Sequence, residues 1–471
     1  MAQHLLPSDC LREIFKFMRE ISETAVEERK LLLSCLLVNR LWCETALEIL
    51  WRDPWRFGRF SRDQIYWKPL SRTIFSCLSK EQKELIKRNN ISLSLTDKRP
   101  LFDYIPSIQF LSNDHIKKVV ENILMTGVKC SDTLFHYNAN ILENELWKLF
   151  MKKCVTVRYL QLPNTPIVHF PGANQCLAAL SEFECSAYAP IKLFLDLAQV
   201  CRNIKSMIID PCGDDNDGLE TLICLQNNLQ HVRLHSIEDD KCQRIGEALK
   251  TQSKTLTSLY ESSICIPSNI IAELNNLKSL SIMIDELDTD LDQLGLIELP
   301  NLEALEIMSS AYQPLDLYTS LIKTTIGSLR KIVFKTFPPP SEVEIQPYIQ
   351  TIINQCPNIE EITLWYIEEI YPDLEQLLSS YLDYQLACDA TSIFGLLIKK
   401  SSHNLAQLNL SGNWRFTVND LEGFLKMWKG RKPLSLKLTC DVVITSTYME
   451  VLDYFTSVGI LKSWSQGWPE C

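Results

Sequence analysis

Two histidines and a cysteine in the middle of the chain have side chains of the types that bind transition metals. His231 and His235 are four residues apart, and Cys242 follows seven residues later. Imidazoles and thiolates at such short separations are typical ligands of Zn²⁺. The two histidines, however, flank a predicted strand at 232–234, and surface histidines explain them more simply. We therefore predict no metal site and no cofactor.

An acidic run between Asp210 and Asp217 raises the question of calcium. Within it, Asp214 and Asp215 add two more carboxylates. A calcium loop of the EF-hand type needs a glutamate at its closing position, after the central glycine, and the run has none there. We interpret the run as a solvated acidic loop.

No arrangement typical of an enzyme occurs in the sequence. It lacks a Walker loop, a dinucleotide-binding fingerprint, a Gly-x-Ser-x-Gly elbow and a His-Glu-x-x-His helix. Seven histidines leave few general bases, and no cysteine is tied by spacing to a histidine partner. We predict no catalytic residues and no enzyme activity. The alternative is an enzyme that the sequence does not reveal, which would need a deep pocket with convergent polar groups.

Composition and charge restrict the partners. The 47 basic and 58 acidic residues give a net charge of -11, which disfavours nucleic acid and anionic membranes. No apolar stretch reaches the roughly 18 residues of a membrane span. The 17 cysteines are odd in number, and no two have the spacing of a zinc knuckle or redox pair. Reduced, buried thiols in a cytoplasmic or nuclear protein fit this usage best.

Functional side chains need secondary structure to position them. The first elements that the sequence predicts are amphipathic helices at the N-terminus. Residues 7–9 form a helix-start signal, and Leu11, Ile14, Phe15 and Met18 recur at helical spacing. After a charged stretch, the leucines of 31–50 predict a second helix, which Trp51 follows. From periodicity alone, a small helical cap on a larger fold is an equally good interpretation.

The individual residues of this segment resemble an F-box. The matching positions are Leu6-Pro7, Cys10-Leu11, Ile14-Phe15, the run from Leu37 to Trp42, and Leu50-Trp51. The segment departs from the family at Asn39, where cysteine is usual, and its charged connector is long. In that family, the Leu-Pro turn and the apolar helix faces bind the Skp adaptor of SCF-type ubiquitin ligases. The resemblance implies that the adaptor contacts or their immediate support are Leu6, Pro7, Leu11, Ile14, Phe15, Leu37, Val38 and Trp42.

A repeated pattern of apolar residues occupies the chain from Val157 onward. Its middle residues are Leu160, Phe183, Met207, Val232, Leu259, Leu280, Leu305, Ile332, Ile362, Leu408 and Leu436. All steps between them but one are 21 to 30 residues, and the remaining step of 46 contains an inserted segment, 371–389. One short strand per unit at this period is typical of leucine-rich repeats, in which a helix returns the chain. A HEAT-type array of paired helices is the alternative, which the alternating strand motifs disfavour.

The repeats resemble the cysteine-containing leucine-rich repeats often found after an F-box, in degenerate form. Only Cys212 and Asn413 occupy the Asn/Cys ladder position, and Glu261 stands where an apolar residue is expected. The predicted fold is therefore α/β: an N-terminal helical F-box, then a curved solenoid with parallel strands on the concave side and helices on the convex side. The predicted domains are an F-box (1–57), a helical connector (58–150), about eleven repeats (151–445) and a C-terminal cap (446–471).

Strand residues that alternate with the core positions are predicted to line the concave surface. They mix aromatic, methionine and cationic side chains, which are enriched in protein interfaces. The predicted surface comprises Tyr159, Gln161, Ile208, His231, Arg233, His235, Tyr260, Met283, Met308, Lys331, Val333, Lys335, Trp365 and Lys437. Among these, the candidate target-binding residues are Arg233, Tyr260, Lys331, Lys335 and Trp365. The basic members fit an acidic or phosphorylated segment.

The resemblance implies a substrate-recognition subunit of an SCF-type ubiquitin ligase. The F-box would bind the Skp adaptor and, through it, the cullin scaffold, while the repeats would hold a target protein for ubiquitination. On this interpretation the chain supplies proximity, and other subunits carry out the transfer. The alternative is a leucine-rich-repeat scaffold or sensor that has no role in a ligase.

Overall fold

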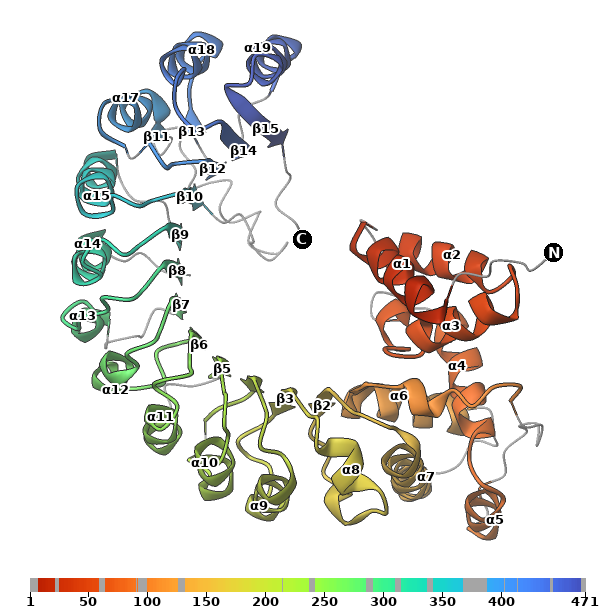
Figure 1. The fold of residues 1–471 in the computed structure, drawn as a ribbon. Helices are drawn as coiled ribbons and strands as arrows, with labels where there is room; N and C mark the ends of the chain where they lie inside the picture. Colours follow the sequence, from red (N-terminus) through yellow and green to blue (C-terminus); the bar gives the residue numbers. More distant parts are fainter. Residues whose placement is uncertain are drawn as a thin grey trace. The chain divides into compact units, whose positions relative to one another are not determined.

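A computed structural model describes most of the chain and divides it into two compact units (Figure 1). The first unit is Met1–Met207 with Leu225–Asn227, and the second is Ile208–Cys224 with Asn228–Cys471. The described residues are 7–21, 25–58, 64–89, 91, 100–125, 132–213, 215–236, 242–284, 291–309, 315–336, 342–366, 388–401, 403–412, 414–440 and 444–466.

Three helices begin the first unit: α1 (Ser8–Ile21), α2 (Ala25–Cys35) and α3 (Arg40–Leu50). They share a core in which Leu11 and Phe15 of α1 pack with residues of the other two helices. The sequence predicted a single helix over 31–50, whereas the chain turns between α2 and α3. Asn39 causes the new start, because its side-chain oxygen accepts a hydrogen bond from the backbone N–H of Trp42 at 3.0 Å and caps α3.

The predicted helical connector contains four described helices and one short strand. The helices are α4 (Gln64–Ser76), α5 (Lys80–Arg88), α6 (Asn113–Leu124) and α7 (Asp132–Lys153). Strand β1 (Phe110–Leu111) was not predicted, because two residues are too few to show alternation. It pairs in parallel with β2 (Tyr159–Gln161), which in turn pairs with β3 (Glu182–Cys185). Helices α8 (Ala173–Leu177) and α9 (Ile191–Val200) complete these first repeats, and β4 (Ser206–Ile209) follows.

The second unit continues the alternation of one strand and one helix. Its parallel strands lie side by side in chain order: β5 (His231–His235), β6 (Ser258–Ser262), β7 (Ser279–Ile284), β8 (Ala304–Ser309), β9 (Lys331–Thr336), β10 (Glu361–Tyr366), β12 (Gln407–Gly412), β14 (Leu434–Cys440) and β15 (Leu461–Gln466). Within this unit the strands line the inner side of a curve, and the helices lie along its outer side (Figure 1).

The helices of the second unit follow the strands one by one. They are α10 (Asp217–Cys224), α11 (Gln243–Lys250), α12 (Ser268–Glu273), α13 (Leu291–Leu294), α14 (Leu315–Thr324), α15 (Glu342–Gln355), α17 (Ala390–Lys400), α18 (Val418–Met427) and α19 (Ser446–Ser457). Near the predicted insertion, β11 (Cys388–Asp389) and β13 (Trp414–Arg415) form a separate parallel pair. None of the described helices is both long and apolar enough to cross a membrane.

The strand register confirms the repeat pattern. Leu305 lies opposite Leu280 on one side and Ile332 on the other, and Leu408 lies between Ile362 and Leu436 in the same way. All eleven predicted middle residues lie in strands and are buried. Because lateral neighbours within each unit stack these apolar residues into rows, the chain has the leucine-rich-repeat fold. The alternative of paired helices without strands is wrong.

Candidate protein-interaction surfaces

The turn between α2 and α3 exposes large apolar side chains. Leu37 is 89% exposed and Val38 is 56% exposed, although they lie only two and three residues after the buried Cys35 of α2. Ile14 and Phe17 on the outer face of α1, together with Leu31 and Leu33 of α2, are also exposed. Isolated exposed leucines are common, but a collection of them in one small helical cluster is typical of a surface that binds another protein.

The predicted adaptor-binding residues separate into two groups in this structure. Leu11 and Phe15 are fully buried, and the Trp42 ring packs edge-on against Phe15 with centroids 5.4 Å apart. These three residues therefore support the helices from inside. Pro7, Ile14, Leu37 and Val38 are exposed and available for contact. Leu6 lies outside the described residues.

Charged groups hold α1 against α3. The Arg12 guanidinium donates to Glu48 at 3.0 Å and to Asp9 at 2.9 Å. The hydrogen bond from Arg12 to Glu48 raises the pKa of the guanidinium. This bridge fixes the two helices whose buried residues support the exposed turn.

A second candidate surface lies on the open face of β5 and β6 in the second unit. Arg233 and Tyr260 are lateral partners in the sheet, and the guanidinium carbon lies 5.0 Å from the centre of the Tyr260 ring. The His235 ring lies 5.1 Å from the same ring, and the Tyr260 hydroxyl is 3.9 Å from the sulfur of Met283. Arg233 is exposed, and Tyr260 and His235 are half-buried. Tyr260 thus packs against both the Arg233 guanidinium and the His235 ring on this face of the sheet.

The remaining residues predicted on the concave surface differ in how far their side chains are exposed to solvent and in whether they already contact another residue. Lys331 is exposed and forms an ion pair of 3.2 Å with Glu361. Val333 was expected on the surface and is only 6% exposed, so that expectation is wrong for this residue. The backbones of Lys335 and Trp365 are lateral partners in β9 and β10, but their side chains lie outside the described part of the structure.

In the first unit, the predicted surface residues bind a carboxylate that the sequence did not single out. The Tyr159 hydroxyl and the Gln161 amide both donate to Glu184 on the neighbouring strand, the latter at 2.9 Å. Gln161 also donates to Asp114 at 3.0 Å. Glu184 is two residues beyond the start of β3 and alternates with buried Phe183 and Cys185, which is the signal that would have identified it. These strands offer a more acidic face than β5 and β6.

A groove in the first unit lies beside Cys77, and a cysteine in a groove is a residue that an enzyme could use as a nucleophile. Its volume is about 980 Å³, and lysines and carboxylates line it. Two of these lysines form ion pairs, Lys148 with Glu145 at 2.6 Å and Lys153 with Asp103 at 3.1 Å. Burial raises the pKa of the Cys77 thiol to about 11. The thiol is therefore protonated at neutral pH and is a poor nucleophile.

The two histidines and the cysteine that the sequence suggested as metal ligands lie in different environments in the folded chain. His231 is exposed and His235 contacts Tyr260, whereas Cys242 is buried beside Cys212 and Cys265. In the acidic run, Asp217 forms an ion pair with Arg244, and the Arg244 backbone N–H donates to Asp215 at 3.0 Å. The run therefore packs against the start of α11.

Comparisons with known proteins add little beyond the fold. No protein-family model matches the sequence, and no curated protein matches it either. Among solved structures, the chain is similar to an internalin from Listeria monocytogenes, with 11% identity, a TM-score of 0.30, and coverage of 74% of this chain and 93% of the internalin chain. A similarity this distant carries no functional argument, so the strand register remains the basis for the fold.

Proposed function

We propose that this chain is a non-catalytic leucine-rich-repeat scaffold that holds a protein partner on the open face of β5 and β6. The observation that carries the proposal is that the exposed Arg233 packs against the half-buried Tyr260, which also contacts the half-buried His235, on adjacent strands. Arginine and tyrosine dominate the energetics of many protein interfaces. An arginine guanidinium binds carboxylate or phosphate oxygens well, so the partner segment is acidic or phosphorylated.

We further infer that α1 to α3 bind a Skp-type adaptor, which makes the chain the substrate-recognition subunit of an SCF-type ubiquitin ligase in the cytosol or nucleus. This finer proposal is supported by the resemblance of residues 6–51 to an F-box and by the exposure of Leu37 and Val38. The chain would bring the target close to the transferring subunits, which raises the effective concentration of target lysines.

The decisive experiment compares three variants of the full chain with the wild type. The first, Leu37→Asp with Val38→Asp, should lose binding to a purified Skp-type adaptor. The second, Arg233→Ala with Tyr260→Ala, should keep adaptor binding and lose co-purifying target proteins. The third, Leu101→Asp, changes a leucine that is 88% exposed outside the three-helix cluster and should affect neither.

The outcomes separate the two parts of the proposal. Adaptor binding that survives in the first variant would make the ligase role wrong and leave the scaffold. An unchanged set of co-purifying proteins in the second variant would make the strand-face assignment wrong. Melting curves of all three variants establish that any loss reflects the altered surface and not an unfolded chain.

A further inference from the structure

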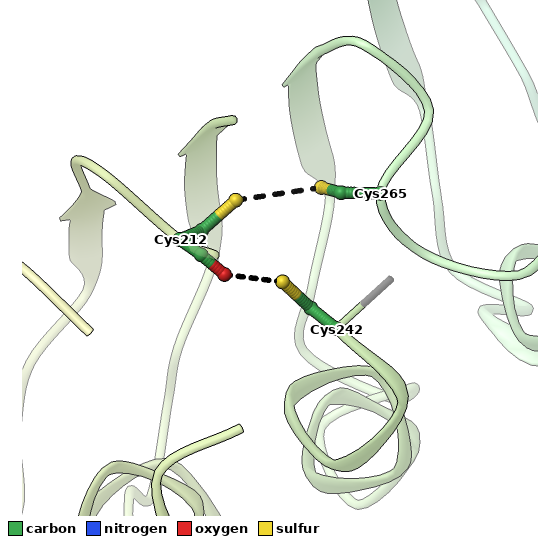
Figure 2. Close-up of side chains that lie close together, drawn as sticks. All are labelled: Cys212, Cys242 and Cys265. Atoms are coloured by element: carbon green, nitrogen blue, oxygen red, sulfur yellow. Dashed lines mark hydrogen bonds between the residues drawn. The ribbon is translucent and has the colours of Figure 1, made fainter. Parts of the chain in front are cut away.

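Three cysteines far apart in the sequence meet in the interior of the second unit. Cys212 follows β4, Cys242 precedes α11, and Cys265 follows β6. Their sulfur atoms all lie within 4.8 Å of one another, and those of Cys212 and Cys265 are 3.6 Å apart (Figure 2). All three side chains are at most 1% exposed. Among the residues that the structure describes, this is the one group of three or more metal-ligating side chains at such distances.

Backbone hydrogen bonds hold the three turns in place independently of the thiols. The Cys242 N–H donates to the Cys265 carbonyl at 2.9 Å, and the Cys212 N–H donates to the His235 carbonyl at 2.9 Å. Figure 2 shows Cys242 and Cys265 on the same side of Cys212, with the Cys242 thiol donating to the Cys212 backbone carbonyl and the Cys265 sulfur facing the Cys212 sulfur. The scaffold therefore brings the sulfurs together before any ligand arrives, which reduces the entropic cost of binding one.

The distances match those of a zinc site. Two thiolates bound to one Zn²⁺ at about 2.3 Å in tetrahedral geometry lie about 3.8 Å apart. The Cys212 to Cys265 separation of 3.6 Å is already close to that value. The widest separation, at most 4.8 Å, needs to close by only about 1 Å, which side-chain rotation provides.

A buried carboxylate accompanies the thiols. Glu261 stands at an inward position of β6, is 0% exposed, and accepts hydrogen bonds from the N–H groups of Cys265 and Ile266 at 3.2 and 3.5 Å. The Glu261 carboxylate therefore fixes the turn that carries Cys265.

We propose that Cys212, Cys242 and Cys265 form a structural zinc site in which their three thiolates bind one Zn²⁺, while the Glu261 carboxylate holds the Cys265 turn through its hydrogen bonds to the backbone. The ion would connect the turns of three successive repeats. Because binding displaces three thiol protons, affinity for zinc falls as the pH is lowered.

The test uses the full chain, purified under reducing conditions and supplied with zinc. We expect about one zinc per chain by mass spectrometry of the metal, and a melting temperature that falls when a chelator is present during refolding. Cys212→Ser and Cys265→Ser should each lose the bound zinc. Cys356→Ser is the matched control, because Cys356 is also about 1% exposed in the second unit and lies outside the cluster. It should retain the metal.

Cobalt provides a second measurement that does not depend on the variants folding. The wild-type chain reconstituted with Co²⁺ should show the near-ultraviolet absorption of thiolate-to-cobalt charge transfer and the visible bands of a tetrahedral ion. Absence of stoichiometric zinc and of the cobalt bands in the wild type would overturn the site. So would equal metal loss in Cys356→Ser, or a Cys212 to Cys265 disulfide in the reduced preparation.

Discussion

The turn before α3 and the strands of the second unit both carry leucines, but these side chains have opposite environments. Leu408 is 0% exposed, and its lateral neighbours Ile362 and Leu436 are apolar residues in register. Leu37 is 89% exposed. In the repeats, the fold itself accounts for each apolar residue. In the turn, the fold leaves Leu37 in solvent, so contact with a binding partner explains this apolar residue better.

Because Leu408 is buried and Leu37 is exposed, the free energy of burying a leucine contributes to a different process at each position. Burying a leucine side chain is worth about 1.5 to 3 kcal/mol. At Leu408 that energy stabilises the folded chain, whereas at Leu37 it is available for association. A substitution in the repeats should therefore change stability, and one in the turn should change binding.

The largest effect is expected from Leu408→Ala. Removal of this buried side chain should lower the free energy of unfolding by about 2 to 5 kcal/mol, since neighbouring strands cannot fully close the cavity. Lys437→Ala changes an exposed residue of the adjacent strand and should shift stability by less than about 0.5 kcal/mol. Thermal and denaturant unfolding measure both. Equal stability of the two variants would mean that the inward and outward positions are wrongly assigned.

Leu37→Ala should have the second largest effect, on binding alone. We expect affinity for a purified Skp-type adaptor to fall by about 2 kcal/mol, which is roughly 30-fold, because an exposed anchor loses its contact with the partner. The melting temperature should stay within the error of the wild type. Isothermal titration and thermal unfolding together test this. A lowered melting temperature with intact binding would show that the turn is packed in solution, and the comparison with Leu408 would fail.

Arg233→Ala should have a smaller effect, on the other surface. Target binding should weaken by about 1 to 2 kcal/mol, since the guanidinium supplies both charge and the stacking contact with Tyr260. Arg233→Lys keeps the charge and loses the planar fork, so it should restore only part of the affinity. Binding of a captured target at several salt concentrations distinguishes the variants. If Arg233→Lys binds as tightly as the wild type, charge alone is sufficient and the Tyr260 contact has no role.

The sequence was sufficient to place the repeats because a strand of alternating apolar residues, repeated at one period, leaves little freedom in register. Leu280, Leu305 and Ile332 illustrate this, since each was assigned from spacing and each lies opposite the next. β1 was missed because two residues show no alternation. Val333 was misassigned because alternation alone does not reveal that a residue on the open face is covered by its surroundings.

The cysteine cluster could not be found by the spacing rules for metal motifs. Its members are 30 and 23 residues apart, so no short motif joins them. The available signal was positional: Cys212 and Cys265 each lie three residues beyond the end of a strand. Glu261 was noticed as a departure from the apolar pattern, but its hydrogen bonds to the turn could be seen only in the folded chain.

The smallest effect is expected from Asn39→Ala, at the end of the same exposed turn. Asn39 accepts the Trp42 N–H at 3.0 Å, so its loss should destabilise α3 by about 1 kcal/mol, the usual value of an N-cap.

Asn39→Asp is the matched control for this change, because aspartate caps a helix equally well and its charge favours the N-terminus. It should melt like the wild type. Neither variant should reduce adaptor affinity as much as Leu37→Ala, since Asn39 positions the turn and the leucine makes the contact. If Asn39→Ala abolished adaptor binding without lowering the melting temperature, the asparagine itself would contact the partner. The division of the turn into a structural residue and apolar contact residues would then be wrong.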